Sequence, residues 1–203
     1  MNTTPLLKAG LSLLLILCFT SLYAQNKAVV KPIPIENPVT YTSVAKMVSD
    51  SFGAPASLVE EFIREAKALE KDEGIPATAF IGIAILESTG FTSFLYKQAL
   101  NPFGMRATKI WQGPTFVMFH EGADAPFRRY DSPRQAVRDF NAFLESRKWF
   151  NDALLCSVTD IECFLNGMSA NRLKKEPGYA SDPEWPNKVR RVIKTYKLDK
   201  LRG

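Results

Sequence analysis

The chain has 203 residues, of which 46% are hydrophobic and 23% charged, and its formal net charge is +5. That length is enough for one domain with a hydrophobic core. The mildly basic balance suits an anionic polymer and equally suits simple solubility, so charge identifies no partner and gives little support to nucleic-acid binding. The only histidine, His120, and the few cysteines are too small a set for the usual zinc sites. We therefore expect no metal and no organic cofactor.

The N-terminal segment is typical of a secretory signal peptide. Lys8 precedes a continuous apolar run over residues 9–20, and Ser21–Ala24 supplies a cleavage site. The run is too short to cross a bilayer comfortably as a permanent helix, although an uncleaved N-terminal anchor is the alternative. Leu17 before Cys18 is bulkier than lipid-attachment sites usually tolerate. The sequence therefore predicts export to the periplasm or the cell exterior, without stable membrane insertion after cleavage.

Composition divides the chain into three segments. Residues 1–24 are the predicted signal peptide, residues 25–54 an extended leader with a short helix, and residues 55–203 the folded domain. Residues 25–40 contain three prolines and no helical period, which is typical of an extended segment. The pattern shows no internal repeat and no second domain.

Helical signals become regular after the leader. Ser57 and Glu60 predict a capping box for a helix that ends at Gly74. The following helix, over residues 77–86, is apolar on nearly every side and must therefore be buried. Glu87 comes directly at its end.

The helical period is lost over residues 103–131. Glycines separate short runs at Thr115–Phe119 and Phe127–Tyr130, which predict a small antiparallel sheet. Helices resume at Ser132, which caps a third helix, and at Asp182, which caps a last one. Helices, a small sheet and further helices predict an α+β fold that is mostly helical and two-lobed.

Two cysteines lie late in the chain. Cys156 and Cys163 are seven residues apart, and in an oxidising compartment such a pair closes a short loop through a disulfide. A pair of buried thiols is the alternative. We favour the disulfide.

Glu87 is the strongest catalytic candidate. Its position at the end of an apolar helix predicts a carboxyl beside buried hydrocarbon, where desolvation raises the pKa. Cleavage of a glycosidic bond needs such a proton donor, because the departing sugar oxygen is a poor leaving group until it is protonated. A helix-end glutamate that simply faces solvent is the alternative.

Four motifs then point to one family. They are Ala84–Phe91, Asn101–Ala107, Phe127–Ser132 and Gly178–Pro183. In this order, and over about residues 55–198, they resemble the glucosaminidase domain of glycoside hydrolase family 73, the group of bacterial autolysins and flagellar peptidoglycan hydrolases. The resemblance implies a lysozyme-like, two-lobed fold with a small antiparallel β-lobe.

The same resemblance assigns roles to residues. It makes Glu87 the general acid, and it places Tyr179 in the cleft near that acid. The family often has a second acidic residue in its β-lobe, which falls on Glu121, with Asp124 as the competitor and a solvated turn residue as the alternative for Glu121. The stretch Ser88–Phe91 departs from the family's usual Ser-Gly-Trp-Gly, so we expect the loop after the acid to turn differently.

Flat rings bind the apolar faces of sugars, so aromatic residues near Glu87 are candidates for substrate contact, although most such rings are core residues. The candidates are Phe91, Tyr96, Phe103, Trp111 and Phe119.

The leading hypothesis is an endo-β-N-acetylglucosaminidase that cleaves peptidoglycan glycan strands, with attack by water or by the substrate's own acetamido group. The alternatives are a muramidase or lytic transglycosylase of the same fold, and a non-catalytic wall-binding protein. The sequence contains no separate wall-binding module, so the domain binds by its own cleft or a partner of unknown identity recruits it.

Overall fold

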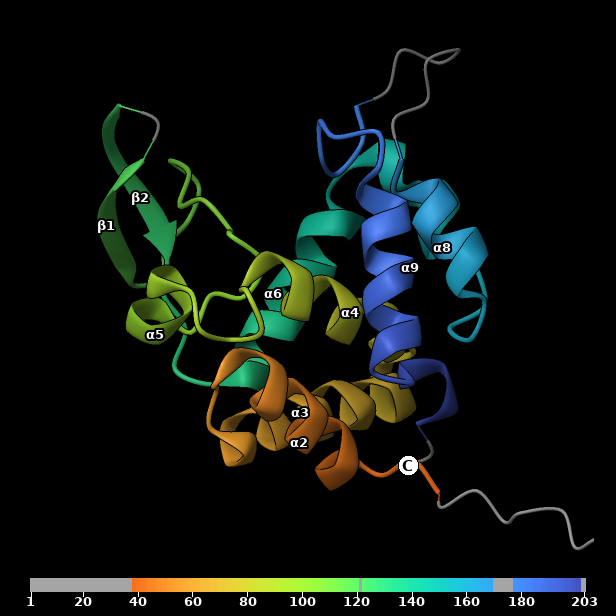
Figure 1. Ribbon diagram of the computed structural model, residues 1–203. Coiled ribbons are helices and arrows are strands. Elements are labelled where there is room, and N and C mark those ends of the chain that lie inside the picture. The colour runs from red at the N-terminus through yellow and green to blue at the C-terminus, as the bar shows by residue number, and fades with distance from the viewer. Residues whose placement is uncertain (1–37, 121, 170–176, 202–203) are drawn as a thin grey trace, which may run out of the picture. The chain divides into compact units, whose positions relative to one another are not determined.

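The computed structural model describes residues 38–120, 122–169 and 177–201 (Figure 1). The predicted signal peptide, most of the leader and Glu121 lie outside the described residues. Within these residues, no helix combines the length and the apolar character that crossing a bilayer requires.

The described residues form a mostly helical α+β fold, as predicted. Strands β1 (Thr115–His120) and β2 (Ala123–Arg128) pair as an antiparallel hairpin, which projects to one side of the helices in Figure 1. The helices are α2 (Tyr41–Phe52), α3 (Ala56–Glu73), α4 (Ala77–Glu87), α5 (Phe94–Ala99), α6 (Pro133–Glu145), α7 (Asn151–Leu154), α8 (Ile161–Gly167) and α9 (Trp185–Thr195), with short 3-10 helices at Lys148–Phe150 and Leu198–Lys200.

Helix α4 is the centre of the core, as its apolar sequence predicts. Every residue from Ala77 to Ile85 is buried, and α4 packs against α3, α8 and α9. Gly82 allows α9 to come close, because a Cβ atom at this position would lie 2.7 Å from Ile193 Cγ1. Packing on all sides fixes α4 in position, and this in turn fixes the backbone of Glu87 at its end.

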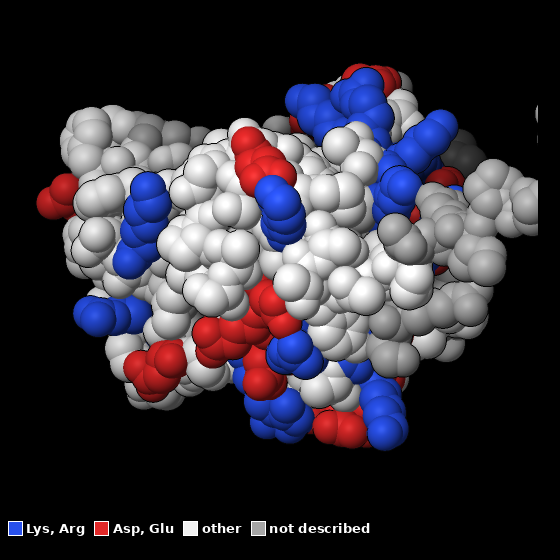
Figure 2. All heavy atoms as spheres, turned by 60° about the horizontal axis from the view of Figure 1, so that its bottom comes forward, with Lys and Arg blue, Asp and Glu red and all other residues white. Residues whose placement is uncertain are grey.

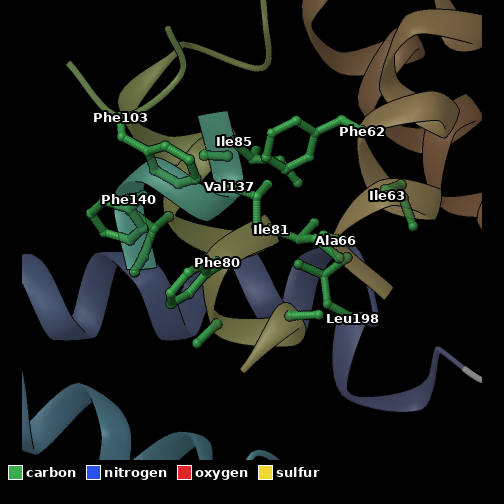
Figure 3. Packing of buried hydrophobic residues seen from close by; sticks show 14 of the residues in the cluster. Phe62, Ile63, Ala66, Phe80, Ile81, Ile85, Phe103, Val137, Phe140 and Leu198 are labelled. Atoms are coloured by element: carbon green, nitrogen blue, oxygen red, sulfur yellow. The ribbon is translucent and has the colours of Figure 1, made fainter. Parts of the chain in front are cut away.

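Aromatic rings fill the space between α4, α6 and the loop after α5. Figure 3 shows Phe80, Phe103 and Phe140 together, and the rings of Phe103 and Phe140 stack with centroids 4.1 Å apart. Phe62 extends the cluster from α3. Rings of this size supply much of the burial that stabilises a domain of this length.

Three predicted boundaries need correction. Helix α3 begins at Ala56 after Pro55, so Ser57 lies inside the first turn and forms no capping box. Strand β2 begins at Ala123, earlier than predicted, because the chain turns directly after β1 at Gly122 with φ +86°. Helix α9 begins at Trp185, and Asp182 instead accepts a hydrogen bond from the Glu184 amide in the turn before it.

Other local predictions are confirmed. Ser132 accepts a hydrogen bond from the Gln135 amide and caps α6, and Gly74 ends α3 in the left-handed conformation. On the face in Figure 2, the lower side of Figure 1, acidic and basic side chains are mixed. Such a surface fits the mild net charge of the chain.

The predicted disulfide between Cys156 and Cys163 is present, with the two Cα atoms 5.8 Å apart. It ties the residues after α7 to α8. We expect the double variant Cys156→Ser, Cys163→Ser to lose about 2–3 kcal/mol of unfolding free energy, because the short loop is no longer closed in the unfolded chain. Urea unfolding of the variant and of the reduced wild type measures the loss, and equal stability of variant and oxidised wild type contradicts the prediction.

Candidate active site

The turn after α4 holds Glu87 at the surface. The Ser88 hydroxyl donates to the Ala84 carbonyl and accepts from the Phe91 amide at 2.8 Å, which closes the helix end. Thr89, Gly90 and Phe91 follow with φ of 52°, 60° and 65°. Three consecutive left-handed residues reverse the chain sharply, so the backbone leaves Glu87 as the last residue of α4, open to solvent.

The carboxyl of Glu87 is held by a tryptophan from α9. Trp185 Nε1 donates a hydrogen bond to Glu87 Oε1 at 2.7 Å, and the Trp185 side chain is buried. The contact follows from the helix packing. Gly82 of α4 lies against Ile193 of α9 while Glu87 lies against Trp185, so the two helices run antiparallel and the end of one meets the start of the other.

The surroundings raise the pKa of Glu87 above its ordinary value. Burial among protein atoms is the main cause, and the hydrogen bond from Trp185 and the positive charge of Lys188 act in the opposite direction. The side chain keeps exposed surface, so the carboxyl lies at the edge of the packed atoms, where solvent reaches it, rather than inside the core. A carboxyl in this position can stay protonated at a higher pH than usual and can donate that proton to a bound group.

Tyr179 lies beside this carboxyl, as the motif suggested. Its ring is 5.0 Å from the Trp185 ring, and burial together with the charge of Glu87 raises its pKa. The Tyr179 hydroxyl donates to the Phe103 carbonyl at 3.0 Å. This hydrogen bond holds the Tyr179 side chain in place. Its ring, packed on Trp185, therefore forms a fixed wall next to Glu87.

Three of the candidate rings for substrate contact are core residues. Phe91 and Tyr96 are 1% exposed and Phe103 is 4% exposed. Phe91 packs against both Phe62 and Tyr96, and Phe103 stacks on Phe140, so these rings have no face open to a sugar. The prediction that they bind substrate is therefore not supported by their positions.

The other two candidate rings lie on the hairpin side. Phe119 of β1 is 70% exposed and pairs in register with Asp124 of β2. Trp111 is half-buried, donates from Nε1 to the Pro114 carbonyl, and lies 4.7 Å from the Arg128 guanidinium. It lines a groove of about 440 Å³ along α6. Both rings can contact a ligand, and Asp124 is exposed beside Phe119.

A small hollow of about 200 Å³ adjoins Trp185. It is lined by Met168, Ser169, Ala180, Ser181, Asp182, Pro183, Trp185 and Pro186. Trp185 thus lines this hollow and also donates to the Glu87 carboxyl.

Sequence reasoning missed Trp185 and Lys188. Both belong to the first two turns of α9, and Trp185 is 98 residues from Glu87 in the chain. The available signal was the tryptophan two residues after the Gly178–Pro183 motif, where the last helix begins.

The sequence of the chain matches a known protein family. Residues 63–198 match the model of the Glucosaminidase family, described as mannosyl-glycoprotein endo-beta-N-acetylglucosaminidase. The chain is 28% identical over 156 residues to the peptidoglycan hydrolase FlgJ of Vibrio cholerae, covering 71% of this chain and 44% of that protein. It is 24% identical over 155 residues to FlgJ of Pseudomonas aeruginosa, covering 70% and 37%. The chain thus spans less than half the length of these relatives.

Solved structures give the same fold. A peptidoglycan hydrolase from Sphingomonas sp. A1 is 24% identical with a TM-score of 0.56, covering 70% of this chain and 89% of that one. The glycoside hydrolase domain of Salmonella typhimurium FlgJ is likewise 24% identical with a TM-score of 0.56, covering 70% and 87%. The catalytic domain of the Listeria monocytogenes autolysin Auto is 16% identical with a TM-score of 0.56, covering 97% and 98%. The expected fold is confirmed.

Proposed function

The chain belongs to the glucosaminidase family, and on this basis we propose that it is an endo-β-N-acetylglucosaminidase that hydrolyses the glycan strands of peptidoglycan. The observation that carries the proposal is the carboxyl of Glu87, which lies at the end of a buried helix with a raised pKa. The similarity to two peptidoglycan hydrolases supports the choice of substrate.

In this proposal Glu87 is the general acid. It protonates the oxygen of the departing sugar as the glycosidic bond breaks, and the electron pair of that bond stays on the oxygen. Tyr179 and Trp185 form the wall that keeps the carboxyl partly desolvated. Desolvation raises the pKa of the acid, so it keeps its proton to a higher pH than an ordinary glutamate, and the protonated form is the state that the reaction needs.

The attacking group comes from the hairpin side or from the substrate. Asp124 on β2 or Glu121, which lies outside the described residues, activates a water molecule, or the substrate's acetamido group attacks the anomeric carbon. An intervening water requires roughly 6.5–9.5 Å between the two carboxyl groups, whereas a direct nucleophile requires about 5–5.5 Å. Phe119, which is exposed on the same hairpin, and Trp111 are the proposed rings for sugar contact.

Residues 1–24 are proposed to direct export and to be removed, which places the domain in the periplasm or outside the cell. Peptidoglycan lies outside the cytoplasmic membrane. The similarity to two peptidoglycan hydrolases therefore supports this location.

Mass analysis of fragments released from purified peptidoglycan tests the function. We expect products that end in a reducing N-acetylglucosamine. Products that end in reducing N-acetylmuramic acid would show a muramidase, and anhydro ends would show a lytic transglycosylase. Binding to the wall without release of fragments would leave the protein as a wall-binding domain and overturn the proposal.

A further inference from the structure

The hydrogen bond between Trp185 and Glu87 fixes which oxygen of the carboxyl can carry a proton. We propose that Trp185 is a positioning residue: its indole N–H occupies Glu87 Oε1 and leaves Oε2 as the oxygen that delivers the catalytic proton. This inference rests on the proposed function, and it assigns to Trp185 a role in the reaction of that site.

The chemistry of indole carries the first step. Trp185 Nε1 has one hydrogen and no lone pair to accept with, so it is only a donor. In a neutral carboxyl the carbonyl oxygen accepts a hydrogen bond more strongly than the hydroxyl oxygen does, so Oε1, 2.7 Å from Trp185 Nε1, is favoured as the carbonyl oxygen. The neutral acid therefore holds its proton on Oε2 for as long as this contact lasts.

The position of Trp185 is fixed, so the contact can orient the carboxyl. The side chain is 4% exposed and its ring packs against Tyr179 at 5.0 Å. Its backbone amide donates to the Asp182 carbonyl at 3.1 Å, which anchors the start of α9. Gly82 brings α9 against α4, the helix that ends in Glu87. Rigid elements therefore hold donor and acceptor, as precise positioning of a reacting group requires.

The same bond becomes stronger as the reaction proceeds. When Oε2 gives its proton to the leaving oxygen, Glu87 becomes a carboxylate and its Oε1 a stronger acceptor. The indole N–H then stabilises the charge that develops, which favours the transition state over the ground state. Burial opposes ionisation, and Lys188 favours it from α9. Lys188 is paired with Asp182 at 2.5 Å, and Tyr179 is the other titratable group beside the carboxyl.

The variant Trp185→Phe keeps an aromatic ring against Tyr179 and removes the N–H donor. We expect the pKa of Glu87 to rise, because the ionised form loses its hydrogen bond. The alkaline limb of the kcat/KM profile on peptidoglycan should shift to higher pH, and the maximum should fall by about 10–100-fold because the carboxyl is less well oriented. The matched control is Trp149→Phe, which removes an indole that is 36% exposed. It should leave the alkaline limb and the maximum of the kcat/KM profile unchanged.

Two titrations followed by NMR test the contact itself. In the variant, the ¹³C carboxyl signal of Glu87, assigned by its loss in Glu87→Gln, reports the pKa directly. In the wild type, the indole N–H signal of Trp185 should shift with the titration of Glu87, and it should be insensitive to pH in Glu87→Gln. This second measurement needs no folded Trp185 variant.

The outcomes are distinct. An unchanged or lowered Glu87 pKa in Trp185→Phe, or an indole signal that ignores the titration, overturns the inference. So does an unchanged rate profile in Trp185→Phe when wild type is active. If wild type releases nothing from peptidoglycan, the proposed function fails together with the catalytic role, while the two titrations still decide whether Trp185 governs the protonation of Glu87.

Discussion

Glu87→Gln is expected to lose about 10²–10⁴-fold or more in the rate of glycan cleavage, while the protein stays folded. Glutamine has the size of glutamate, and its carbonyl oxygen can accept the hydrogen bond that Trp185 Nε1 donates to Oε1. It has no proton to give to a leaving sugar oxygen. The loss should therefore appear in kcat, measured as reducing ends released from purified peptidoglycan.

The stability of this variant should depend on pH in a defined way. Burial raises the folded-state pKa of Glu87 above 4.5, so the folded protein binds this proton more tightly than the unfolded chain. Glu87 therefore lowers the stability of the fold as pH rises through the range above 4.5, and it has no such effect below that range. We expect Glu87→Gln to be at least as stable as wild type at neutral pH, with the difference vanishing in acid. Thermal melts across this range measure it.

Glu145→Gln is the matched control for both measurements. Glu145 is also the last residue of its helix and also accepts a side-chain hydrogen bond, from Asn141 at 2.7 Å. Its replacement should change neither rate nor pH profile. If Glu87→Gln and Glu145→Gln behaved alike, Glu87 would not be the acid. Glu121→Gln and Asp124→Asn then rank the candidates for the second carboxylate, because only the residue that activates water should lose comparable activity.

The sequence predicted those parts of the fold that depend only on residues close together in the chain. An unbroken apolar run sets α4, and the residue at its end is Glu87, so the helix and the candidate acid were both visible. Ser132 with Pro133 set the start of α6 for the same reason. Helices α5, α7 and α8 were not predicted, because helices of four to seven residues are too short to show a helical period.

The motif resemblance pointed to Tyr179, but the other residues of the site could not be predicted, because their positions depend on contacts between distant parts of the chain. Phe91 and Phe119 are the same residue type, yet the first is 1% exposed in the core and the second is 70% exposed on the hairpin. Composition cannot separate a ring that fills the core from one that faces a ligand. Trp185 reaches Glu87 only because Gly82 lets α9 pack closely on α4, and no local pattern in the chain contains that contact.

The hairpin that carries Phe119 and Asp124 is held at its base by a largely buried charge pair. Arg128, at the end of β2, donates from Nη1 to both carboxylate oxygens of Asp139 in α6 at 2.7 Å. Tyr130 donates to the same carboxylate at 2.5 Å. The side chains of Arg128 and Asp139 are 10% and 16% exposed. One carboxylate thus joins the end of the hairpin to the helix.

Asp139→Ala is expected to lower the free energy of unfolding by about 3–5 kcal/mol, because it leaves the Arg128 charge and the Tyr130 hydroxyl without their partner in a largely buried position. Arg138→Ala is the control on the neighbouring residue of α6. Arg138 pairs with Glu73 at the surface, where the side chains are 51% and 36% exposed, and an exposed pair contributes at most about 1 kcal/mol. Urea unfolding with equal m-values measures both.

The same comparison separates a role in folding from a role in holding the hairpin. If the carboxylate of Asp139 anchors β2, limited proteolysis of Asp139→Ala under conditions where it is folded should cut first between β1 and β2, at a rate that Arg138→Ala does not show. Activity should then fall further than the population of unfolded protein explains, because the hairpin carries the proposed sugar contacts. Equal stability losses in the two variants would show that the pair contributes no more than a surface ion pair. The other contacts at the base, such as the hydrogen bond from Asn101 Nδ2 to the Arg128 carbonyl and the packing of Tyr130 against Trp111, would then hold the hairpin.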